Sequence, residues 1–165
     1  MGTQPRPLLA PQALIARYAL LPHPEGGWYR EMHRSTGVVV RGDGAARSGL
    51  TAILFLLEGG DCSRWHRVEG ADESWHFVAG SILELFTLPA GGGSCQRRLL
   101  GSPQADCPAE PLLVVPAGVW QAARSLGAWS LVSCCVGPGF DFADFSLLRD
   151  LPSAAHPCGT LSHLL

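Results

Sequence analysis

Short strand-like segments separated by turns fill most of the chain between residues 50 and 139, and this pattern constrains the fold more than any other feature. A glycine- or proline-containing turn recurs about every ten residues, and no long helical pattern interrupts the series. Such regular spacing is typical of an all-β sandwich or barrel. The expected strands are 50–57, 62–68, 73–79, 81–88, 96–100, 112–116, 120–126 and 129–136.

The segments outside this series are simpler. Residues 11–20 begin with a proline and carry their apolar side chains on one side, which predicts a short helix. Large and polar residues alternate over 28–33 as in a strand, whereas the glycine-containing segment 37–49 is expected to be a loop. With no repeat or linker, the chain is expected to form one domain at 11–151, with a flexible arm at 1–10 and a tail at 152–165.

Composition excludes several classes of function. All 12 basic residues are arginines, so the chain has no lysine for Schiff-base chemistry or for a phosphate-binding P-loop. The formal net charge of −2 gives no electrostatic attraction to nucleic acid or to an anionic membrane. The longest uninterrupted apolar run, 52–57, is far shorter than the roughly 20 residues of a membrane span. We therefore expect a small-molecule ligand, and neither nucleic acid nor membrane as a partner.

The cysteines point to a reducing compartment. None of the 6 cysteines belongs to a CxxC motif, and the first residues of the sequence do not have the pattern of a signal peptide. We therefore expect free, mostly buried thiols and a cytoplasmic location. Cys134 and Cys135 are neighbours within an apolar strand, so their side chains are expected to face opposite sides of a sheet.

The segment 60–80 carries a spaced set of residues that is typical of one superfamily. Gly60, His66, Val68, Glu73 and Gly80 resemble the first cupin motif, G-x5-H-x-H-x4-E-x6-G, except that Val68 stands in place of the second histidine. His66 and Val68 share one face of a strand, and Glu73 lies on the next strand after a turn. The side chains of His66 and Glu73 are therefore expected to converge inside a small barrel.

Two further segments extend the resemblance. Residues 116–121, PAGVWQ, resemble the second cupin motif P-x-G-x-x-H, with Gln121 at the position of the histidine. Residues 22–31, PHPEGGWYRE, are similar to the PHPEGGxYRE signature of small single-domain cupins of unknown function. The agreement continues in order over roughly residues 14–150. It implies an all-β fold, the cupin double-stranded β-helix or jelly-roll barrel with a short N-terminal helix, commonly a dimer and without a settled reaction.

An interior acid–base pair is the first functional hypothesis. His66 is the expected base, Glu73 the group that orients it, and Tyr29 the acid or an anchoring hydroxyl, as in metal-free epimerases of the cupin superfamily. These roles predict an isomerase or epimerase acting on a small polar or anionic molecule. A non-catalytic binding module that uses the same pocket is the alternative, and a metal-dependent oxygenase is a further one. The residues expected to bind the ligand are Glu25, Arg30, Trp75, His76, Trp120 and Gln121.

The same positions bear on metal binding and assembly. His66, Glu73 and Gln121 stand at three cupin metal positions, but one imidazole, one carboxylate and one neutral amide make a poor set for zinc or iron. We therefore expect no cofactor, with a divalent metal held by these three residues as the alternative. The strand at 28–33 is available to pair with a second subunit, which predicts a homodimer.

Overall fold

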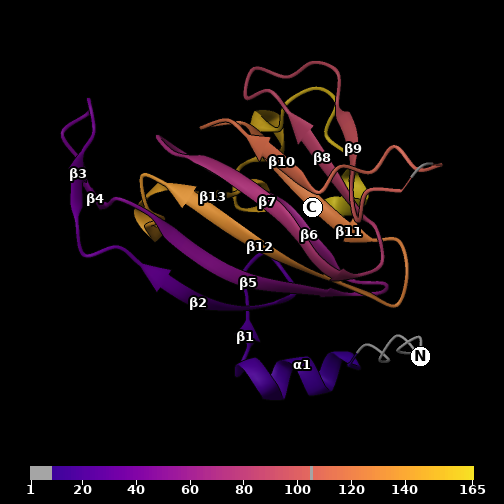
Figure 1. Ribbon diagram of the computed structural model, residues 1–165. Helices are drawn as coiled ribbons and strands as arrows, with labels where there is room; N and C mark the ends of the chain where they lie inside the picture. Colours follow the sequence, from indigo (N-terminus) through magenta and orange to yellow (C-terminus); the bar gives the residue numbers. More distant parts are fainter. Residues whose placement is uncertain (1–8, 105) are drawn as a thin grey trace, which may run out of the picture.

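The computed structural model describes residues 9–104 and 106–165 and contains two antiparallel β-sheets packed face to face, with one α-helix outside them (Figure 1). This is the all-β jelly-roll arrangement predicted from the spacing of the strands. Apart from its last two residues, the expected arm at 1–10 lies outside the described residues. The α-helix and the strands are α1 (Pro11–Tyr18), β1 (Leu21–Pro22), β2 (Trp28–Arg34), β3 (Val38–Val40), β4 (Ala46–Ser48), β5 (Thr51–Glu58), β6 (Cys62–Val68), β7 (Asp72–Gly80), β8 (Leu83–Leu88), β9 (Gln96–Leu100), β10 (Leu112–Val115), β11 (Trp120–Ser125), β12 (Trp129–Gly137) and β13 (Phe145–Leu147).

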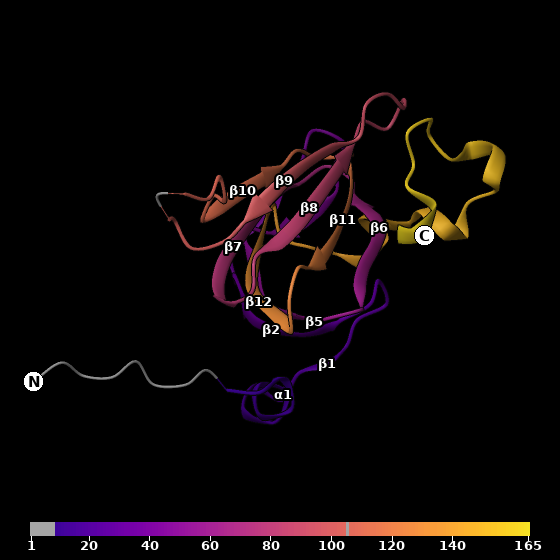
Figure 2. The ribbon, with the colours of Figure 1, turned by 90° about the vertical axis from the view of Figure 1, so that its right-hand side faces the viewer.

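The order of strands in the sheets decides which side chains meet. The larger sheet has the order β1-β2-β5-β12-β7-β10, and the other has the order β13-β6-β11-β8-β9 (Figure 2). Strands β6 and β7 follow one another in the chain but belong to different sheets. His66 and Glu73 were expected on neighbouring strands; they lie instead on strands of the two facing sheets, which enclose the interior between them.

Alternation along the strands builds the core. On β12, Val132 and Cys134 are buried in the interior, whereas Ser133 and Cys135 are only partly buried. The opposite orientation expected for Cys134 and Cys135 follows from this alternation, and all six cysteines are free thiols. We name the buried residues of this part of the interior the apolar cluster: Phe55, Leu57, Trp75, Leu83, Leu85, Leu100, Leu113, Val115, Ala123, Val132 and Cys134.

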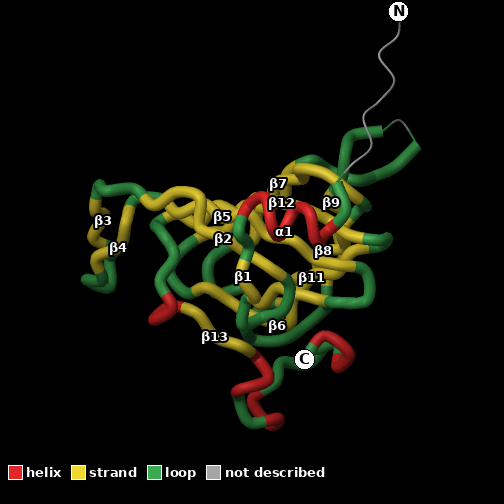
Figure 3. The backbone as a smooth tube through the Cα atoms, turned by 90° about the horizontal axis from the view of Figure 1, so that it is seen from below, coloured by secondary structure: helices red, strands yellow, loops and turns green. Residues whose placement is uncertain are grey.

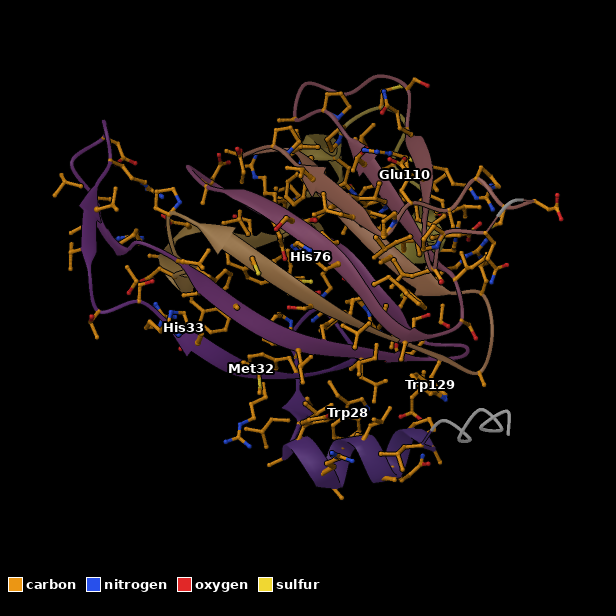
Figure 4. All side chains as sticks on the ribbon, viewed as in Figure 1. Trp28, Met32, His33, His76, Glu110 and Trp129 are labelled. Atoms are coloured by element: carbon orange, nitrogen blue, oxygen red, sulfur yellow. The ribbon has the colours of Figure 1, made fainter. Side chains whose placement is uncertain are left out.

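Helix α1 covers part of the outer face of the larger sheet (Figures 3 and 4). Leu14 is its buried residue and packs in one cluster with Leu56 and Trp129 of the sheet. The helix ends at Tyr18, because Ala19 adopts a left-handed conformation with φ 49°. It is therefore two residues shorter than the segment 11–20 predicts. Among the described residues, no helix has the length and apolar character needed to span a membrane.

The expected loop at 37–49 is corrected by the structure, because it contains the hairpin β3–β4. Val38 to Val40 form a run of β-branched residues that favours a strand in spite of the surrounding glycines. Arg41 and Arg47 of this hairpin both bind the carboxylate of Asp144, with shortest N–O distances of 2.9 and 2.7 Å. Asp144 belongs to the short 3-10 helix Phe142–Asp144, so the hairpin is joined to the segment that precedes β13.

The C-terminal segment 152–165, expected to be a tail, packs against the smaller sheet. It contains the 3-10 turns Ser153–Ala155 and Ser162–Leu164, and Leu164 is buried in one cluster with Trp65 and Trp120. The indole Nε1 of Trp65 also donates a hydrogen bond to the carbonyl oxygen of Leu161 at 3.1 Å. The outer face of this sheet is therefore covered by the end of the chain, as α1 covers part of the other sheet.

Candidate functional site

A cavity of about 470 Å³ opens between the two sheets. That volume is within the range of small-molecule sites. Apolar side chains form much of its wall, among them Phe55, Phe140 and Phe145. Its polar and ionisable lining side chains include His23, Glu25, Tyr29, His66 and Glu73.

The structure brings five of the predicted site residues to this cavity. His66 contributes from β6, Glu73 from β7, Tyr29 and Arg30 from β2, and Glu25 from the loop that precedes β2. Four groups of this wall are strongly shielded from water, since Glu25, His66 and Glu73 are buried and the His23 side chain is only 7% exposed. The predicted pocket is therefore present, but its polar groups are more numerous than the cupin motifs alone indicate.

Two of the predicted ligand-binding residues lie behind the cavity wall. The indole Nε1 of Trp75 donates to Oε1 of Gln121 at 2.8 Å, and Nε2 of Gln121 donates to Oε2 of Glu73 at 2.6 Å. Because an indole N–H only donates, it fixes the orientation of the amide and directs the NH₂ group to Glu73. Trp75 and Gln121 are interior, as expected, but they support Glu73 from behind and do not line the cavity.

The other two predicted ligand-binding residues lie outside the barrel interior. His76 belongs to the outward-facing set of β7, where its Nε2 is 2.9 Å from the hydroxyl of Ser74 (Figure 4). No bulge turns it inward, because its register with Ser133 of β12 keeps it beside outward-facing neighbours. Trp120 is buried in the cluster under the C-terminal segment, where Arg67 stacks on its ring at 4.6 Å. Strand alternation therefore directs both side chains away from the cavity.

Glu25 reaches the interior because two glycines make a tight turn behind it. Gly26 and Gly27 have positive φ values of 109° and 71°, and a Cβ on Gly26 would lie 2.2 Å from the carbonyl oxygen of Cys62. Backbone N–H of Arg64 donates to the carbonyl oxygen of Glu25 at 2.8 Å, which joins this turn to β6. Glu25 was expected to bind the ligand, and in the wall its carboxyl group contacts His23, Ser63 and His66.

Glu25 and His66 share one contact that requires a proton. Nδ1 of His66 is 2.8 Å from the carbonyl oxygen of Arg64, a group that only accepts, so Nδ1 carries the ring proton. Nε2 is then unprotonated in the neutral ring, and it faces Oε2 of Glu25 at 3.3 Å. The hydroxyl of Ser63 donates to the other oxygen, Oε1, at 2.7 Å. The pair is satisfied either by protonated Glu25 donating to Nε2 or by an imidazolium beside a carboxylate.

Burial dominates the electrostatics of these groups. Desolvation raises the pKa of Glu25 and raises that of Glu73 to about 7, since a buried carboxylate loses its hydration. Desolvation likewise lowers the pKa of His23 and of His66, and the neighbouring glutamates offset only part of this effect. All four groups are therefore shifted toward their neutral forms. Near neutral pH Glu73 populates both of its protonation states, as a general acid or base requires.

His23 is the functional residue that sequence reasoning did not single out. It lies in the cavity wall beside Tyr29, with the two ring centroids 4.5 Å apart, and its Nδ1 is 3.4 Å from Oε2 of Glu25. The available signal was its position inside the segment PHPEGGWYRE. For His23 the segment served only as a family signature, and no cupin motif position corresponds to this histidine.

The residues at the three cupin metal positions do not fit a metal ion. The ligating atom of Gln121, Oε1, is used by Trp75, and its NH₂ group faces Glu73. Both ring nitrogens of His66 face protein oxygens, and Val68 offers no ligand. Within residues 9–104 and 106–165 no three His, Cys, Asp or Glu side chains are grouped to hold a metal. The donor set therefore matches neither zinc nor iron.

Exposed charged side chains of β2 line the cavity where it meets solvent, which we call its mouth: Arg30, Glu31 and Arg34. Arg34 makes a bidentate pair with Glu31 at 2.7 and 2.9 Å and also donates to the carbonyl oxygen of Phe140. Arg30 donates from Nη1 to the carbonyl oxygen of Tyr18 at 3.0 Å. The side chain of Arg34 is therefore engaged with the protein, whereas Arg30 keeps further N–H groups for a ligand.

Two solved structures are similar to this chain over most of its length. A hypothetical protein from Leishmania major is 31% identical, with 84% of this chain and 86% of that chain covered and a TM-score of 0.77. A protein from Shewanella oneidensis is 33% identical, with 86% and 85% covered and a TM-score of 0.76. KdgF from a Halomonas species is only 17% identical, with 78% and 93% covered and a TM-score of 0.54, so it shows a likeness of fold alone.

The family assignment rests on a match that is longer than any one motif. No protein of the curated collection matches this chain. The family model described as "Cupin superfamily (DUF985)" matches residues 12–148, which include α1 from its second residue, β1 to β13 and every residue of the cavity wall described above. The chain therefore belongs to the DUF985 family of the cupin superfamily.

Proposed function

We propose that the cavity binds a small polar molecule and that Glu73 exchanges a proton with it, as in an isomerase or epimerase. One observation carries the proposal: Glu73 is buried in the cavity wall, and its pKa is raised to about 7 by desolvation. A carboxyl group with such a pKa takes and returns protons near neutral pH, where an ordinary glutamate stays ionised.

The neighbouring residues support this role in different ways. Gln121 donates to Glu73 from behind and holds the carboxyl group in place. His66, expected from the sequence to be the base, faces Glu25, so we assign the proton transfer to Glu73 and a supporting role to the Glu25–His66 pair. Tyr29 lines the same wall and remains the proposed acid or anchoring hydroxyl. At the mouth, the N–H groups that Arg30 keeps would hold an anionic part of the ligand.

Deuterium incorporation tests the proposal without knowledge of the product. The protein is incubated in D₂O with a panel of aldoses, ketoses, nucleoside diphosphate sugars and amino acids, and mass spectrometry detects carbon-bound deuterium. We expect one class of compound to exchange, Glu73→Gln to abolish the exchange, and Glu69→Gln, at a half-exposed carboxylate outside the cavity, to leave it unchanged. If no compound exchanges while some bind in the cavity, the protein is a binding module and the proposed reaction is wrong.

We also propose a homodimer that pairs through β2. The two residues of β1 pair only with Trp28 and Tyr29, so among the described residues no strand covers that edge of β2 from Arg30 to Arg34. Open edges of this kind pair readily with another strand. Light scattering should give twice the 17.5 kDa of the chain, and a proline at Met32 should reduce the mass to that of one subunit. A single-chain mass for the unmodified protein would contradict the dimer.

Two further expectations stay predictions. The identity of residues 22–31 as a signature of the family is supported by its place in the cavity wall, where it contributes His23, Glu25 and Tyr29. The cytoplasmic location is supported by six free thiols. Imaging of the tagged protein in its own cells tests the location.

A further inference from the structure

His23 is held in a fixed position in the cavity wall, but it has no role in the proton transfer proposed for Glu73. It begins a closed turn, in which its N–H donates to the carbonyl oxygen of Gly27 and its own carbonyl accepts from Gly26, both at 3.0 Å. The N–H of Gly27 in turn donates to Asp61 at 3.1 Å. The turn is thus held on both sides, and the ring packs edge-on against Tyr29, Phe55 and Phe145.

Hydrogen bonding determines which nitrogen of His23 carries the proton. The backbone N–H of Glu25 points at Nδ1 of His23 with an N–N distance of 3.3 Å. A backbone N–H always donates, so Nδ1 is the acceptor and the neutral ring carries its proton on Nε2. His66 has the opposite tautomer, because a backbone carbonyl accepts from its Nδ1. The two imidazoles of the cavity are therefore arranged as one N–H donor and one proton-accepting nitrogen.

The Nε2–H of His23 is the donor of this pair that stays available. Within the described residues no protein acceptor is hydrogen-bonded to it, and His23 lines the cavity. Among the described residues, Nε2 of His23 is not one of the buried polar atoms that lack a partner, so it is reached from the cavity, where a ligand oxygen can accept its hydrogen bond. The neighbouring rings lower the local polarity, so a hydrogen bond formed there is strong.

The combination of this donor with Glu73 specifies a class of substrate. A carboxylate removes a proton from carbon readily only where an adjacent carbonyl group accepts the negative charge. We propose that the ligand is a carbonyl compound whose oxygen accepts a hydrogen bond from Nε2–H of His23 while Glu73 exchanges the proton on the neighbouring carbon. This inference rests on the proposed function and extends it to a substrate class.

The step balances without any co-reactant. Glu73 takes the proton from the α-carbon, the C–H electron pair forms the C=C bond of an enolate, and the carbonyl π pair moves to its oxygen. The hydrogen bond from His23 strengthens as this oxygen becomes negative, which stabilises the transition state more than the bound substrate. Return of the proton to the same carbon, on either face, or to the oxygen-bearing carbon after transfer between oxygens gives an epimer or an isomer.

A nitrogen-15 NMR experiment tests the donor in the unmodified protein. Protein labelled with [¹⁵N]histidine is dialysed against chelator, and long-range ¹H–¹⁵N correlations report the tautomer of each ring. His23→Gln and His66→Gln assign the cavity signals, and His76→Gln, on the outer face of β7, is the matched control. We expect His23 to carry its proton on Nε2 and His66 on Nδ1. A proton on Nδ1 of His23 would overturn the inference.

Acetohydroxamate, a small mimic of an enediolate, then tests the ligand class. Its addition should shift the Nε2–H signal of His23, and His23→Gln should weaken its binding about tenfold or more, the size expected for a lost hydrogen bond to a charged oxygen. His76→Gln should bind it as the unmodified protein does. Unchanged affinity in His23→Gln would contradict the assignment of this donor.

The two proposals fail in distinguishable ways. If deuterium enters only carbons without a neighbouring carbonyl, or enters equally in His23→Gln, the carbonyl inference is wrong while proton transfer by Glu73 stands. If acetohydroxamate binds through His23 and no compound of the panel exchanges, the site recognises carbonyl oxygens without catalysis. In that case the proposed function is wrong and the ligand class stands.

Discussion

Two parts of the same barrel interior differ sharply in how they are filled. The apolar cluster packs large side chains such as Trp75 and Leu113 between the sheets and leaves them almost fully buried. The other part is a cavity whose wall includes the buried carboxyl groups of Glu25 and Glu73 and two imidazoles. On β7 the cavity and the apolar cluster are next to each other, since Glu73 of the cavity and Trp75 of the cluster lie two residues apart on the same face. Successive inward-facing positions of one strand therefore serve different purposes: Trp75 packs the core and Glu73 faces the cavity.

The border between the two parts is a hydrogen-bonded chain. Trp75 donates to Gln121, which donates to Glu73, so one end of the chain lies in the apolar cluster and the other in the cavity wall. The position that carries a metal-binding histidine in the second cupin motif is occupied here by the residue that makes this connection. Replacement of a ligand by an amide thus converts a metal position into a support for a carboxyl group.

Trp75→Ala should give the largest effect, because it removes a buried indole from the apolar cluster. Loss of such a side chain costs about 3–5 kcal/mol of unfolding free energy, and Gln121 loses its donor as well. Chemical denaturation measures the loss. Trp28→Ala, at a half-buried indole under helix α1, should cost clearly less, and equal costs would contradict the contrast between the two positions.

Glu73→Gln should change the pH dependence of stability and little else in the fold. Burial raises the pKa of Glu73 from 4.5 to about 7, so between these values the folded protein holds a proton that the unfolded chain has released. The stability of the unmodified protein relative to the variant should therefore fall as pH rises through this window. The expected change is on the order of 3 kcal/mol.

Denaturation of both proteins from pH 4 to pH 8 measures this difference. The imidazoles of His23 and His66 titrate in the unmodified protein and in the variant, so their contribution largely cancels. A difference that stays constant over the range, or that changes in the opposite direction, would show that folding does not raise the pKa of Glu73.

Metal content tests the role of Gln121 in the hydrogen-bonded chain between Trp75 and Glu73. Because Gln121 directs its NH₂ group to Glu73, chelator-dialysed protein should hold far less than one transition-metal ion per chain by elemental analysis. The double variant Val68→His, Gln121→His restores the two imidazoles of the cupin motifs and should gain metal. One tightly held ion in the unmodified protein would show that the cavity uses another ligand set.

His76→Gln should have the smallest effect. The imidazole lies outside the interior and contacts the hydroxyl of Ser74, so its replacement should change the unfolding free energy by no more than about 0.5 kcal/mol. Binding of acetohydroxamate should stay as it is. A loss of acetohydroxamate binding would show that His76 affects the cavity, and it would contradict the assignment of binding to the inward face of β7 alone.

The sequence predicted the fold well because its strands are regular. The period of two in β7 and β12 and the turns between strands follow from residue types at short range, and the cupin spacing added the topology. The hairpin β3–β4 was missed because glycines near Val38 to Val40 favour a loop locally. Pairing with Ala46 to Ser48 and the ion pairs to Asp144 outweigh that preference.

The site was predicted only in part, because several of its contacts join residues that are far apart in the sequence. His66 and Glu73 were found because a motif relates them, whereas the contact of His66 with Glu25 joins residues 41 positions apart and leaves no periodic trace. Trp120 was misplaced because one step of alternation decides whether a residue at a strand start faces the cavity or the C-terminal segment. The tautomer of His23 depends on one backbone N–H, which no residue pattern encodes.

The ion pairs of Arg41 and Arg47 with Asp144 reach as far as the cavity wall. Asp144 lies between Phe142 and Phe145, two rings of the cavity wall, while both arginines belong to a hairpin outside the cavity. Because the hydrogen bonds from Arg47 and Arg41 hold the pKa of Asp144 below its ordinary value, this carboxylate is ionised over the whole neutral range and both ion pairs persist there. The hairpin β3–β4 therefore helps to fix two rings of the cavity wall, although it contributes no side chain to the cavity lining itself.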